Sequence, residues 1–458
     1  MIKSKPHLDL PEDRLASTTQ TGHRVKLYPA DVTGYFRRLR TWVYGFLVLL
    51  FLGLPWLRIH GKPVLLMDVV HLQFTVFGFS FQADDVPVLF LGLAIWGFLI
   101  AMVTALWGRV WCGWACPQTV FIDVIYRRIE RWIEGNAHSQ KLLDKAPWTT
   151  TKILKKVLKT LLFLIVSWLI SHSFLAYFVG SDMVMTMVRS NPLENPVSAA
   201  LTLLLTLLLT LIIWFDFGVF REQFCIIACP YGRFQSVLMD RDSRGVMYDT
   251  VRGEPRSKSS KTGACIDCFR CVQVCPTGVD IRRGLQMECI HCTACIDACD
   301  TVMTKIGAPK GLLRYGSQVE LEGGKRSRIR PMVYGVILFG LVSAMGLVLH
   351  MRQPLRATVV RGHQSFSVMA DTDVLNMFTV HLYNRRSESV SVNLESGDTR
   401  VQILSPVTQT LPPFGRVSVP VVLHFSQNYL QGKPAFVLRV MQAQESLLEI
   451  PVPLLGPL

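Results

Sequence analysis

Charged residues are scarce in this chain, and acidic residues are the scarcest. Asp, Glu, Lys and Arg make up 18% of the 458 residues, while half of the chain is hydrophobic. The mean hydropathy is +0.33, which is too apolar for a soluble protein and indicates membrane spans plus at least two folded domains. The net charge of +15 does not indicate a nucleic-acid partner, because the basic residues are distributed between the apolar stretches as the orientation of a membrane protein requires.

Cysteine is absent before Cys112 and after Cys299, and all twelve cysteines lie between these two positions. The C-terminal region therefore has no disulfide framework. Reduced thiols concentrated in the middle of a chain suit metal clusters instead.

Five apolar stretches are long enough to cross a bilayer: 42–57, 86–107, 157–178, 197–217 and 332–351. Lys plus Arg number eight before the first stretch, and then two, nine, one and eighteen in the successive segments between stretches. This alternation follows the positive-inside rule and predicts a cytoplasmic N-terminus with the region after Met351 on the other side. The opening residues are polar, so we expect no cleavable signal before the first span.

Two ferredoxin-type cysteine runs follow each other in the middle of the chain. Each has the spacing C-x2-C-x2-C-x3-C, in which three thiolates hold one cluster and the fourth ligates the other. The first [4Fe–4S] cluster is assigned to Cys265, Cys268, Cys271 and Cys299. The second is assigned to Cys289, Cys292, Cys295 and Cys275. The alternative is zinc, but structural zinc sites are usually built from pairs of ligands.

A second set of cysteines belongs to a repeated C-x3-C-P motif. The second span runs into Cys112 and Cys116, and the fourth span runs into Cys225 and Cys229. We expect an amphipathic helix to begin at the proline of each motif. The two pairs, brought together by the repeat, would offer four thiols at one membrane edge for Cu(I), zinc or iron–sulfur. The alternative is packing as small hydrophobes, and the spacing does not distinguish copper from iron.

Other candidate residues are weaker. Three alternating methionines are interpreted as an apolar strand or loop edge rather than as copper ligands: Met183, Met185 and Met187. His172 lies within the third span, where an ionisable residue is a functional hypothesis, but a helix–helix hydrogen bond is the better interpretation. Asp216 is expected to pair with Arg221.

The region 352–458 contains short alternating or β-branched runs separated by turn residues. About seven strands in about a hundred residues predict an immunoglobulin-like β-sandwich. It shows no catalytic constellation, so a docking module is expected. The predicted domains are an N-terminal cytoplasmic segment (1–41), a four-span membrane domain (42–230), a cytoplasmic two-cluster ferredoxin module (231–331), a fifth span (332–351) and a periplasmic sandwich (352–458).

Several motifs are shared with one known family. They include Lys26-Leu27-Tyr28-Pro29, the stretch from Gly108 to Thr119, Leu143 to Trp148, Arg252 to Arg256, and Gly278 to Arg282. With these motifs the chain resembles the cytochrome c oxidase accessory proteins of the CcoG/FixG/RdxA family. Ala228 stands where relatives carry Met, which leaves the thiols in place but removes any thioether ligand there.

The resemblance implies a role in maturing a cbb-type haem–copper oxidase in the bacterial inner membrane. The chain would be a cupric reductase that delivers Cu(I) toward the oxidase, with two [4Fe–4S] clusters as cofactors. The implied partners are a cytoplasmic electron donor, copper, membrane lipid and oxidase assembly factors or subunits, and a homodimer is left open. Two alternatives remain: a quinol dehydrogenase that feeds a periplasmic reductase, and a redox-sensing assembly scaffold.

Overall fold

The computed structural model describes residues 25–458 except 60–61, 70–72, 78, 83–84, 190–195, 257–262, 285, 352, 354, 362–365, 369–372, 387, 406–407, 414, 431–434, 443–444 and 457–458. The first 24 residues of the predicted N-terminal segment thus lie outside the described part. The chain divides into two compact units, Met1–Met345 and Gly346–Leu458, and each is described by itself.

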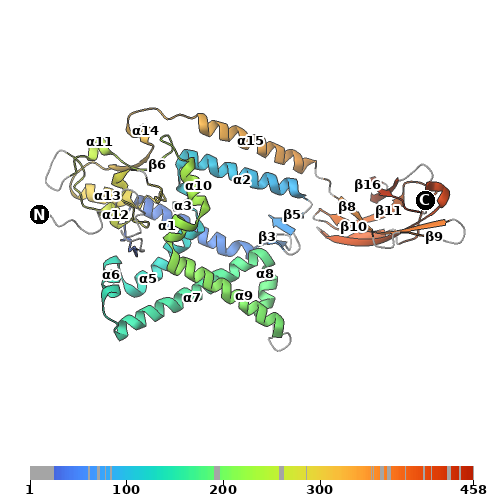
Figure 1. Ribbon diagram of the computed structural model, residues 1–458, viewed down its shortest axis with the longest axis horizontal. Helices are drawn as coiled ribbons and strands as arrows, with labels where there is room; N and C mark the ends of the chain where they lie inside the picture. The colour runs from blue at the N-terminus through green and yellow to red at the C-terminus, as the bar shows by residue number, and fades with distance from the viewer. Residues whose placement is uncertain are drawn as a thin grey trace. The chain divides into compact units, whose positions relative to one another are not determined.

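Within the described part of the chain, five helices are long and apolar enough to cross a membrane, which agrees with the predicted number (Figure 1). They are α1 (Tyr35–Gly53), α2 (Val86–Trp107), α7 (Thr150–Val179), α9 (Pro196–Trp214) and α15 (Ile329–His350). Helix α1 begins seven residues earlier than predicted. The carboxylate of Asp297 accepts the backbone N–H groups of Phe36 (3.2 Å) and Arg37 (2.7 Å), so it satisfies donors that a helix start leaves unpaired.

The segments between the spans carry short elements. Between α1 and α2 lie η1 (Leu54–Trp56), the pair β1 (Arg58–Ile59) and β2 (Lys62–Pro63), and the antiparallel sheet β3 (Leu65–Asp68), β4 (Gln73–Val76) and β5 (Phe79–Gln82). Between α2 and α7 lie α3 (Val110–Trp114), α4 (Pro117–Phe121), η3 (Ile122–Tyr126), α5 (Arg127–Glu134) and α6 (Ala137–Lys145). After α9 come the π-helical turns η4 (Phe215–Phe220) and η5 (Phe224–Ala228), and then α10 (Pro230–Leu238).

The three alternating methionines lie on a helix, α8 (Ser181–Arg189), so the predicted strand or loop edge is wrong. Asp182 in the first turn and Arg189 in the last turn suit the helix dipole. On a helix, alternate residues point to different faces. Met183 and Met185 are exposed, whereas Met187 packs beside the core cluster that contains Val184.

The ferredoxin module is built on a two-stranded antiparallel sheet, β6 (Gly245–Tyr248) with β7 (Leu313–Gly316). Its short helices are α11 (Thr250–Gly253), α12 (Arg270–Gln273), η6 (Ile281–Arg283), α13 (Ala294–Lys305) and α14 (Gln318–Leu321). Cysteines of both runs belong to its core, together with Val246, Ile296 and Leu312. Folding of this core therefore depends on the same residues that are assigned to metal.

The C-terminal unit contains two antiparallel sheets, as an immunoglobulin-like sandwich requires. One sheet has the order β12-β14-β10-β8 with β9 beside β10, and the other has the order β13-β11-β15-β16. The strands are β8 (Leu355–Val360), β9 (Phe366–Val368), β10 (Asp373–Asn384), β11 (Val390–Ser396), β12 (Gln402–Ile403), β13 (Thr408–Leu411), β14 (Arg416–Ser426), β15 (Ala435–Gln442) and β16 (Glu445–Pro453). Alternate side chains of β10 are buried, and Val380 faces Val419 of β14 in the register, so one face of each strand builds the core.

Candidate functional site

Four of the predicted cluster ligands surround one cavity of the ferredoxin module, here called the first cavity. It has a volume of about 380 Å³ and is lined by Cys265, Cys268, Cys271 and Cys299. Cys268 is exposed to solvent, whereas Cys265 and Cys271 are buried. The guanidinium of Arg282 also lines this cavity and lies 4.0 Å from the ring centroid of Phe269. The first cavity therefore combines four thiols with a neighbouring buried cation.

The other four predicted cluster ligands surround the second cavity, of about 350 Å³. It is lined by Cys275, Cys289, Cys292 and Cys295, and also by Cys271, so the two cavities are neighbours. The fourth cysteine of each run thus lies with three cysteines of the other run. This crossed arrangement is the one that the spacing predicts.

Both cysteine runs turn around their cavities with the same unusual backbone. The residues before and after the second cysteine have positive φ in each run: Asp267 (50°) and Phe269 (55°), and His291 (53°) and Thr293 (62°). A non-glycine residue in this region costs about 1–2 kcal/mol and persists only where the surroundings require it. The repetition of this strain at matching positions fits two loops that are shaped to enclose the same kind of group.

The chemistry of these cavities fits an iron–sulfur cube better than a single ion. Among the described residues, no three His, Cys, Asp or Glu side chains converge on one ion. The four thiols of each group instead surround a cavity, which is the arrangement that ligation of a cube-shaped cluster requires. Burial raises the pKa of Cys271 and Cys299 to about 12, because the apolar surroundings disfavour the thiolate. A bound metal group supplies the positive charge that these thiolates need.

The C-x3-C-P motifs form the same turn in both copies. Cys116 and Cys229 have extended backbones (ψ 126° and 109°), the conformation expected before proline. Helix α4 then begins at Pro117 and α10 at Pro230, so both predicted helix starts are confirmed. The two motifs therefore share the step from cysteine to helix, whereas the segment before it is the α-helix α3 in the first motif and the π-helical turn η5 in the second.

The four thiols of the two motifs lie within electrostatic reach of one another. Burial raises the pKa of Cys112 to about 11, and negative charge on Cys116 and Cys229 raises it further, while Arg109 opposes the shift. Burial raises the pKa of Cys225 more strongly, with additional contributions from the other three thiols. The repeat thus brings the two pairs within range of each other's charge, but among the described residues no three of these thiols converge on one ion.

A buried hydrogen-bond network holds the Cys112 thiol. It donates to Oε1 of Gln235 at 3.0 Å. The amide of Gln235 in turn donates to the hydroxyls of Tyr231 (2.7 Å) and Thr104 (3.1 Å). This network fixes the position of the thiol on α3 through residues of two other helices, α10 and α2.

The first thiol motif touches the loop that lines the second cavity. A Cβ atom at Gly113 would lie 2.4 Å from the carbonyl oxygen of Ile290 and 2.9 Å from the backbone nitrogen of Cys292. The Tyr44 hydroxyl donates to the carbonyl of Gly113, and Arg40 donates to the carbonyl of Cys292. Glycine is required here because no side chain fits between the two backbones. The sequence analysis did not predict this contact, although a glycine between the two cysteines of the motif indicates a close approach of another backbone.

Comparison with known proteins shows relatives that span most of the chain. Protein RdxA and Protein RdxB of Cereibacter sphaeroides are each 34% identical to it, over 80% of the chain and 81% and 80% of their own lengths. The nitrogen fixation protein FixG of Rhizobium meliloti is 31% identical over 81% of the chain and 79% of its own length. The chain belongs to the FixG/RdxA family. It is an iron–sulfur electron-transfer protein with several membrane-type helices.

Family models match three parts of this FixG/RdxA protein. A 4Fe-4S dicluster domain matches residues 220–318, and an IG-like fold at the C-terminal of FixG matches residues 345–453. A 4Fe-4S binding domain matches residues 88–136, which contain Cys112 and Cys116. A solved FixG-related protein from Vibrio parahaemolyticus matches 22% of this chain and 93% of its own length at 17% identity, with a TM-score of 0.18.

His291 joins the second cysteine run to the end of α2. Its Nδ1 accepts the backbone N–H of Arg109 at 3.1 Å, and its ring fills the space beside Gly108 and Gly245. Burial lowers the pKa of His291 to about 4, so the imidazole is neutral at physiological pH. This side chain therefore positions the loop that carries Cys289 and Cys292.

Two expectations for single residues are wrong. Arg221 donates to both carboxylate oxygens of Glu130 (2.9 and 2.6 Å), whereas Asp216 accepts from the amide of Gln118 at 3.0 Å. The fold brings α5 beside Arg221 and offers a buried bidentate partner, so Asp216 is not needed. His172 contacts the carbonyl of Trp168 at 2.8 Å, one turn earlier in its own helix, rather than a neighbouring helix.

Proposed function

We propose that this FixG/RdxA protein is a membrane cupric reductase that supplies Cu(I) for the assembly of a cbb-type cytochrome c oxidase. The contact at Gly113 carries the proposal. It joins the first C-x3-C-P motif to the loop of Cys292, and Cys112 belongs to the same buried cluster of residues as Cys292 and Ile290. A thiol suited to copper therefore lies beside a ferredoxin loop suited to a redox cofactor.

The eight cysteines of the two runs are the proposed ligands of two [4Fe–4S] clusters, four around each cavity. When bound, these clusters supply carriers for one electron at a time. The protein residues position the carriers and exclude water. Cys268 is exposed, which favours the first cavity as the entry point from a cytoplasmic donor. The second cavity, beside Gly113, is the exit toward the thiols.

The thiols of Cys112, Cys116, Cys225 and Cys229 are the proposed copper ligands. Thiolates are soft and favour Cu(I) over Cu(II), so binding there assists the reduction. The reaction adds one electron to Cu(II) and requires no nucleophile or general acid. The protein contributes ligands, a buried site and a short path between carriers.

We further propose that the ferredoxin module faces the cytoplasm and the C-terminal unit the periplasm of an inner membrane. The alternation of basic residues between the spans supports this orientation. The periplasmic unit, whose sequence shows no catalytic constellation, then serves to dock oxidase assembly factors or subunits. The orientation keeps the thiols, which oxidation would convert to disulfides, on the reducing side of the membrane.

Copper reduction by the purified protein tests this function. Dithionite-reduced protein is mixed with Cu(II), and Cu(I) is detected with a Cu(I)-specific chelator. We expect Cys112→Ala and Cys225→Ala to lower both copper binding and reduction, while iron content stays at the wild-type level. The double variant should lose little more than either single variant, because residues that act as a unit are not additive. Met185→Ala, which removes an exposed sulfur from α8, is the matched control.

The quinol dehydrogenase remains the second candidate, because a 4Fe-4S binding domain matches the segment that contains Cys112 and Cys116. That segment has two cysteines only, so a cluster there would need Cys225 and Cys229 as well. Anaerobic metal analysis separates the two functions. Extra iron that is lost with Cys112 and electron transfer that depends on quinol would favour the dehydrogenase. Full oxidase assembly in cluster-ligand variants would favour a scaffold.

A further inference from the structure

An arginine stands between each inward-leading span and its C-x3-C-P motif, but the two arginines differ in their charge partners. Arg221, before the second motif, donates to both carboxylate oxygens of the buried Glu130. Arg109, before the first motif, is 4% exposed, and no carboxylate of the described residues forms an ion pair with it. Burying a guanidinium without an acid beside it is costly, so other groups must supply the counter-charge of Arg109.

The guanidinium of Arg109 contacts segments of both sites. Its Nη1 donates to the carbonyl of Met287, two residues before the cluster ligand Cys289. A Cβ atom at Gly232, in the first turn of α10, would lie 2.7 Å from Nη2 of Arg109 and 3.0 Å from the carbonyl oxygen of Cys225. Arg109 therefore lies between the second ferredoxin run and the second thiol motif.

The charged form that this guanidinium stabilises is the thiolate. Burial raises the pKa of Cys225 and of Cys289, and the charge of Arg109 opposes the rise at both. Burial also raises the pKa of Cys112, where the charge of Arg109 and its hydrogen bond to the sulfur oppose the rise. Ligands of the second cluster and of the thiol site thus provide the counter-charge of Arg109.

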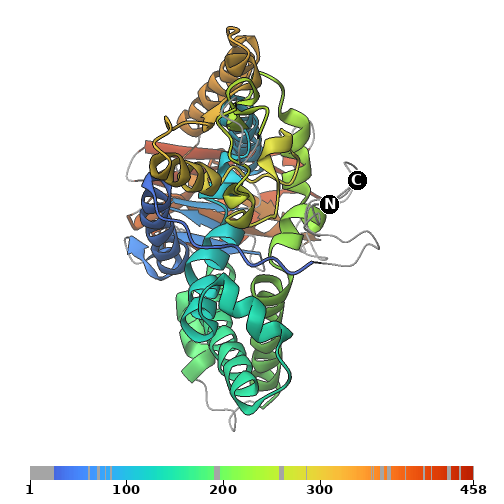
Figure 2. The same cartoon turned by 90° about the vertical axis from the view of Figure 1, so that its left-hand side faces the viewer.

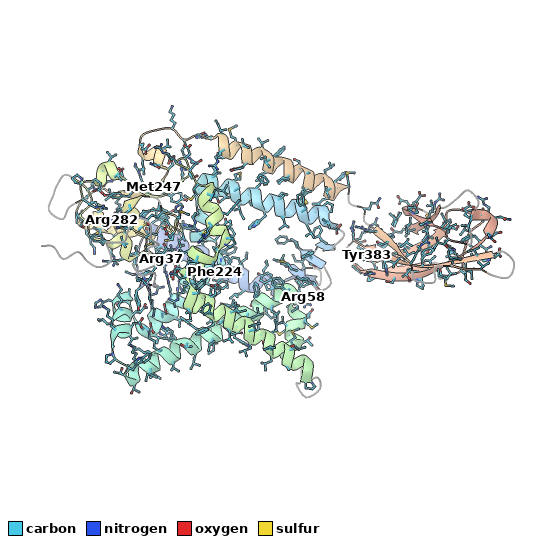
Figure 3. All side chains as sticks on the ribbon, in the orientation of Figure 1. Arg37, Arg58, Phe224, Met247, Arg282 and Tyr383 are labelled. Carbon is cyan, nitrogen blue, oxygen red and sulfur yellow. The ribbon has the colours of Figure 1, made fainter. Side chains whose placement is uncertain are left out.

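The cation beside the first cavity is arranged differently. Arg282, whose side chain is 3% exposed, pairs with Asp267 at 2.6 Å and with Asp280 at 2.7 Å. Two carboxylates exceed the charge of one guanidinium, so this group does not favour an extra electron at the first cavity. Figure 2 shows the yellow ferredoxin module facing the viewer, and Figure 3 labels Arg282 in this module, apart from Phe224 at the second thiol motif. The two cavities thus differ in the charge that lies beside them.

This difference affects where an electron rests. Reduction adds one negative charge to a [4Fe–4S] cluster, and burial opposes that addition. All four thiols of the second cavity are buried or half-buried, whereas Cys268 of the first cavity is exposed. Arginine keeps its charge at every physiological pH, so Arg109 offsets this cost of burial. Two unit charges about 10 Å apart interact strongly enough, at an effective dielectric constant of about 20, to change an equilibrium by roughly tenfold.

We propose that Arg109 raises the reduction potential of the second cluster and thereby holds the electron beside the membrane-edge thiols. The proposal deepens the proposed function and rests on it for the entry and exit of the electron. A cytoplasmic donor of the reduced flavin or iron–sulfur class is oxidised by one electron and the second cluster is reduced by one electron, with no bond made or broken. Arg109 ligates no metal and acts through its charge.

Reduction potentials measured without copper test this role. Purified protein is titrated with dithionite and followed by low-temperature paramagnetic resonance, and the signal of the second cluster is the one that Cys275→Ser removes. In the wild type we expect this signal at the higher potential of the two. Arg109→Gln should lower its reduced-to-oxidised ratio at a fixed potential on the order of tenfold, which is about 59 mV for one electron, and spare the other cluster. Arg109→Lys keeps the charge and should match the wild type.

Two further variants serve as controls. Arg241→Gln removes the same charge from an exposed pair with Glu322 that lines neither cluster cavity, and it should change neither potential. Asp267→Asn removes a carboxylate beside the first cavity, and asparagine suits the positive φ of this position. This variant should raise the potential of the first cluster and leave the second unchanged. Iron content shows whether each variant retains both clusters.

The outcomes separate the role of Arg109 from the copper chemistry. Unchanged potentials in Arg109→Gln would overturn the proposal, and an equal fall in Arg109→Lys would do the same, because shape rather than charge would then be responsible. A second cluster that is reduced only after the first in the wild type would also overturn it, and this measurement needs no variant. Shifted potentials in a protein that does not reduce copper would support the role of Arg109 and reject the cupric reductase.

Discussion

Replacing Gly113 by alanine tests the contact on which the proposed function depends. Gly113 lies in the short helix α3 and has no positive φ, so alanine suits its backbone. In a helix this change alone is worth about 1 kcal/mol in favour of alanine. The new methyl group would nevertheless lie 2.4 Å from the carbonyl oxygen of Ile290. Backbone atoms cannot rotate away, so the two segments must separate.

The size of the effect follows from that distance. Ordinary van der Waals contact begins at 3.4 Å, so the segments must move apart by about 1 Å. Overpacking of a core costs about 1–3 kcal/mol, and this overlap is severe. We therefore take the upper part of that range, about 2–3 kcal/mol, and subtract the helix preference of about 1 kcal/mol, which leaves a net destabilisation of about 1–2 kcal/mol. The Cys292 loop and the Cys112 thiol, which lie on the two sides of this contact, also move apart. We therefore expect slower copper reduction.

The assay combines stability with electron transfer in detergent-solubilised protein. Thermal loss of the iron–sulfur absorbance reports stability, and stopped-flow mixing of reduced protein with Cu(II) reports transfer. Gly97→Ala is the control, because Gly97 lies on α2 and a Cβ there meets nothing within 4 Å. We expect the control to reduce copper at the wild-type rate and to gain up to about 1 kcal/mol of stability from the helix preference of alanine. Wild-type stability together with a wild-type reduction rate in Gly113→Ala would refute the close contact and the path that it supports.

Three further predictions address the clusters, the membrane edge and the topology. Cys275→Ser should remove the paramagnetic signal of the cluster held mainly by the second run and spare the other; the reverse loss would contradict the crossed assignment. Glu130→Gln should cost about 3 kcal/mol, because it leaves the buried guanidinium of Arg221 without its carboxylate; a loss below about 1 kcal/mol in chemical unfolding would contradict this. Reporter fusions at Ser260 and Gly397 should report opposite sides of the membrane, and signals from the same side would reject the five-span orientation.

The elements that the sequence determined are those governed by local rules. Five apolar stretches of sufficient length became five helices, because length and hydropathy are properties of a continuous segment. Helices begin at Pro117 and Pro230, because proline restricts the residue before it and suits the first helical turn. The cysteine spacing predicted two groups of four thiols for a similar reason, because three of the four thiols of each group come from one short loop.

The tertiary structure decided what joins distant parts of the chain. Nothing near Arg221 in the sequence indicates Glu130 as its partner, and the nearer Asp216 was the wrong choice. The helix at Met183 depends on packing of one face against neighbouring spans, which alternation along the sequence does not show. The contact between Gly113 and Ile290 exists only once both segments are folded together. Cysteine spacing is a local property of the sequence and could therefore be predicted from it. Contacts between remote backbone segments depend on how the whole chain packs.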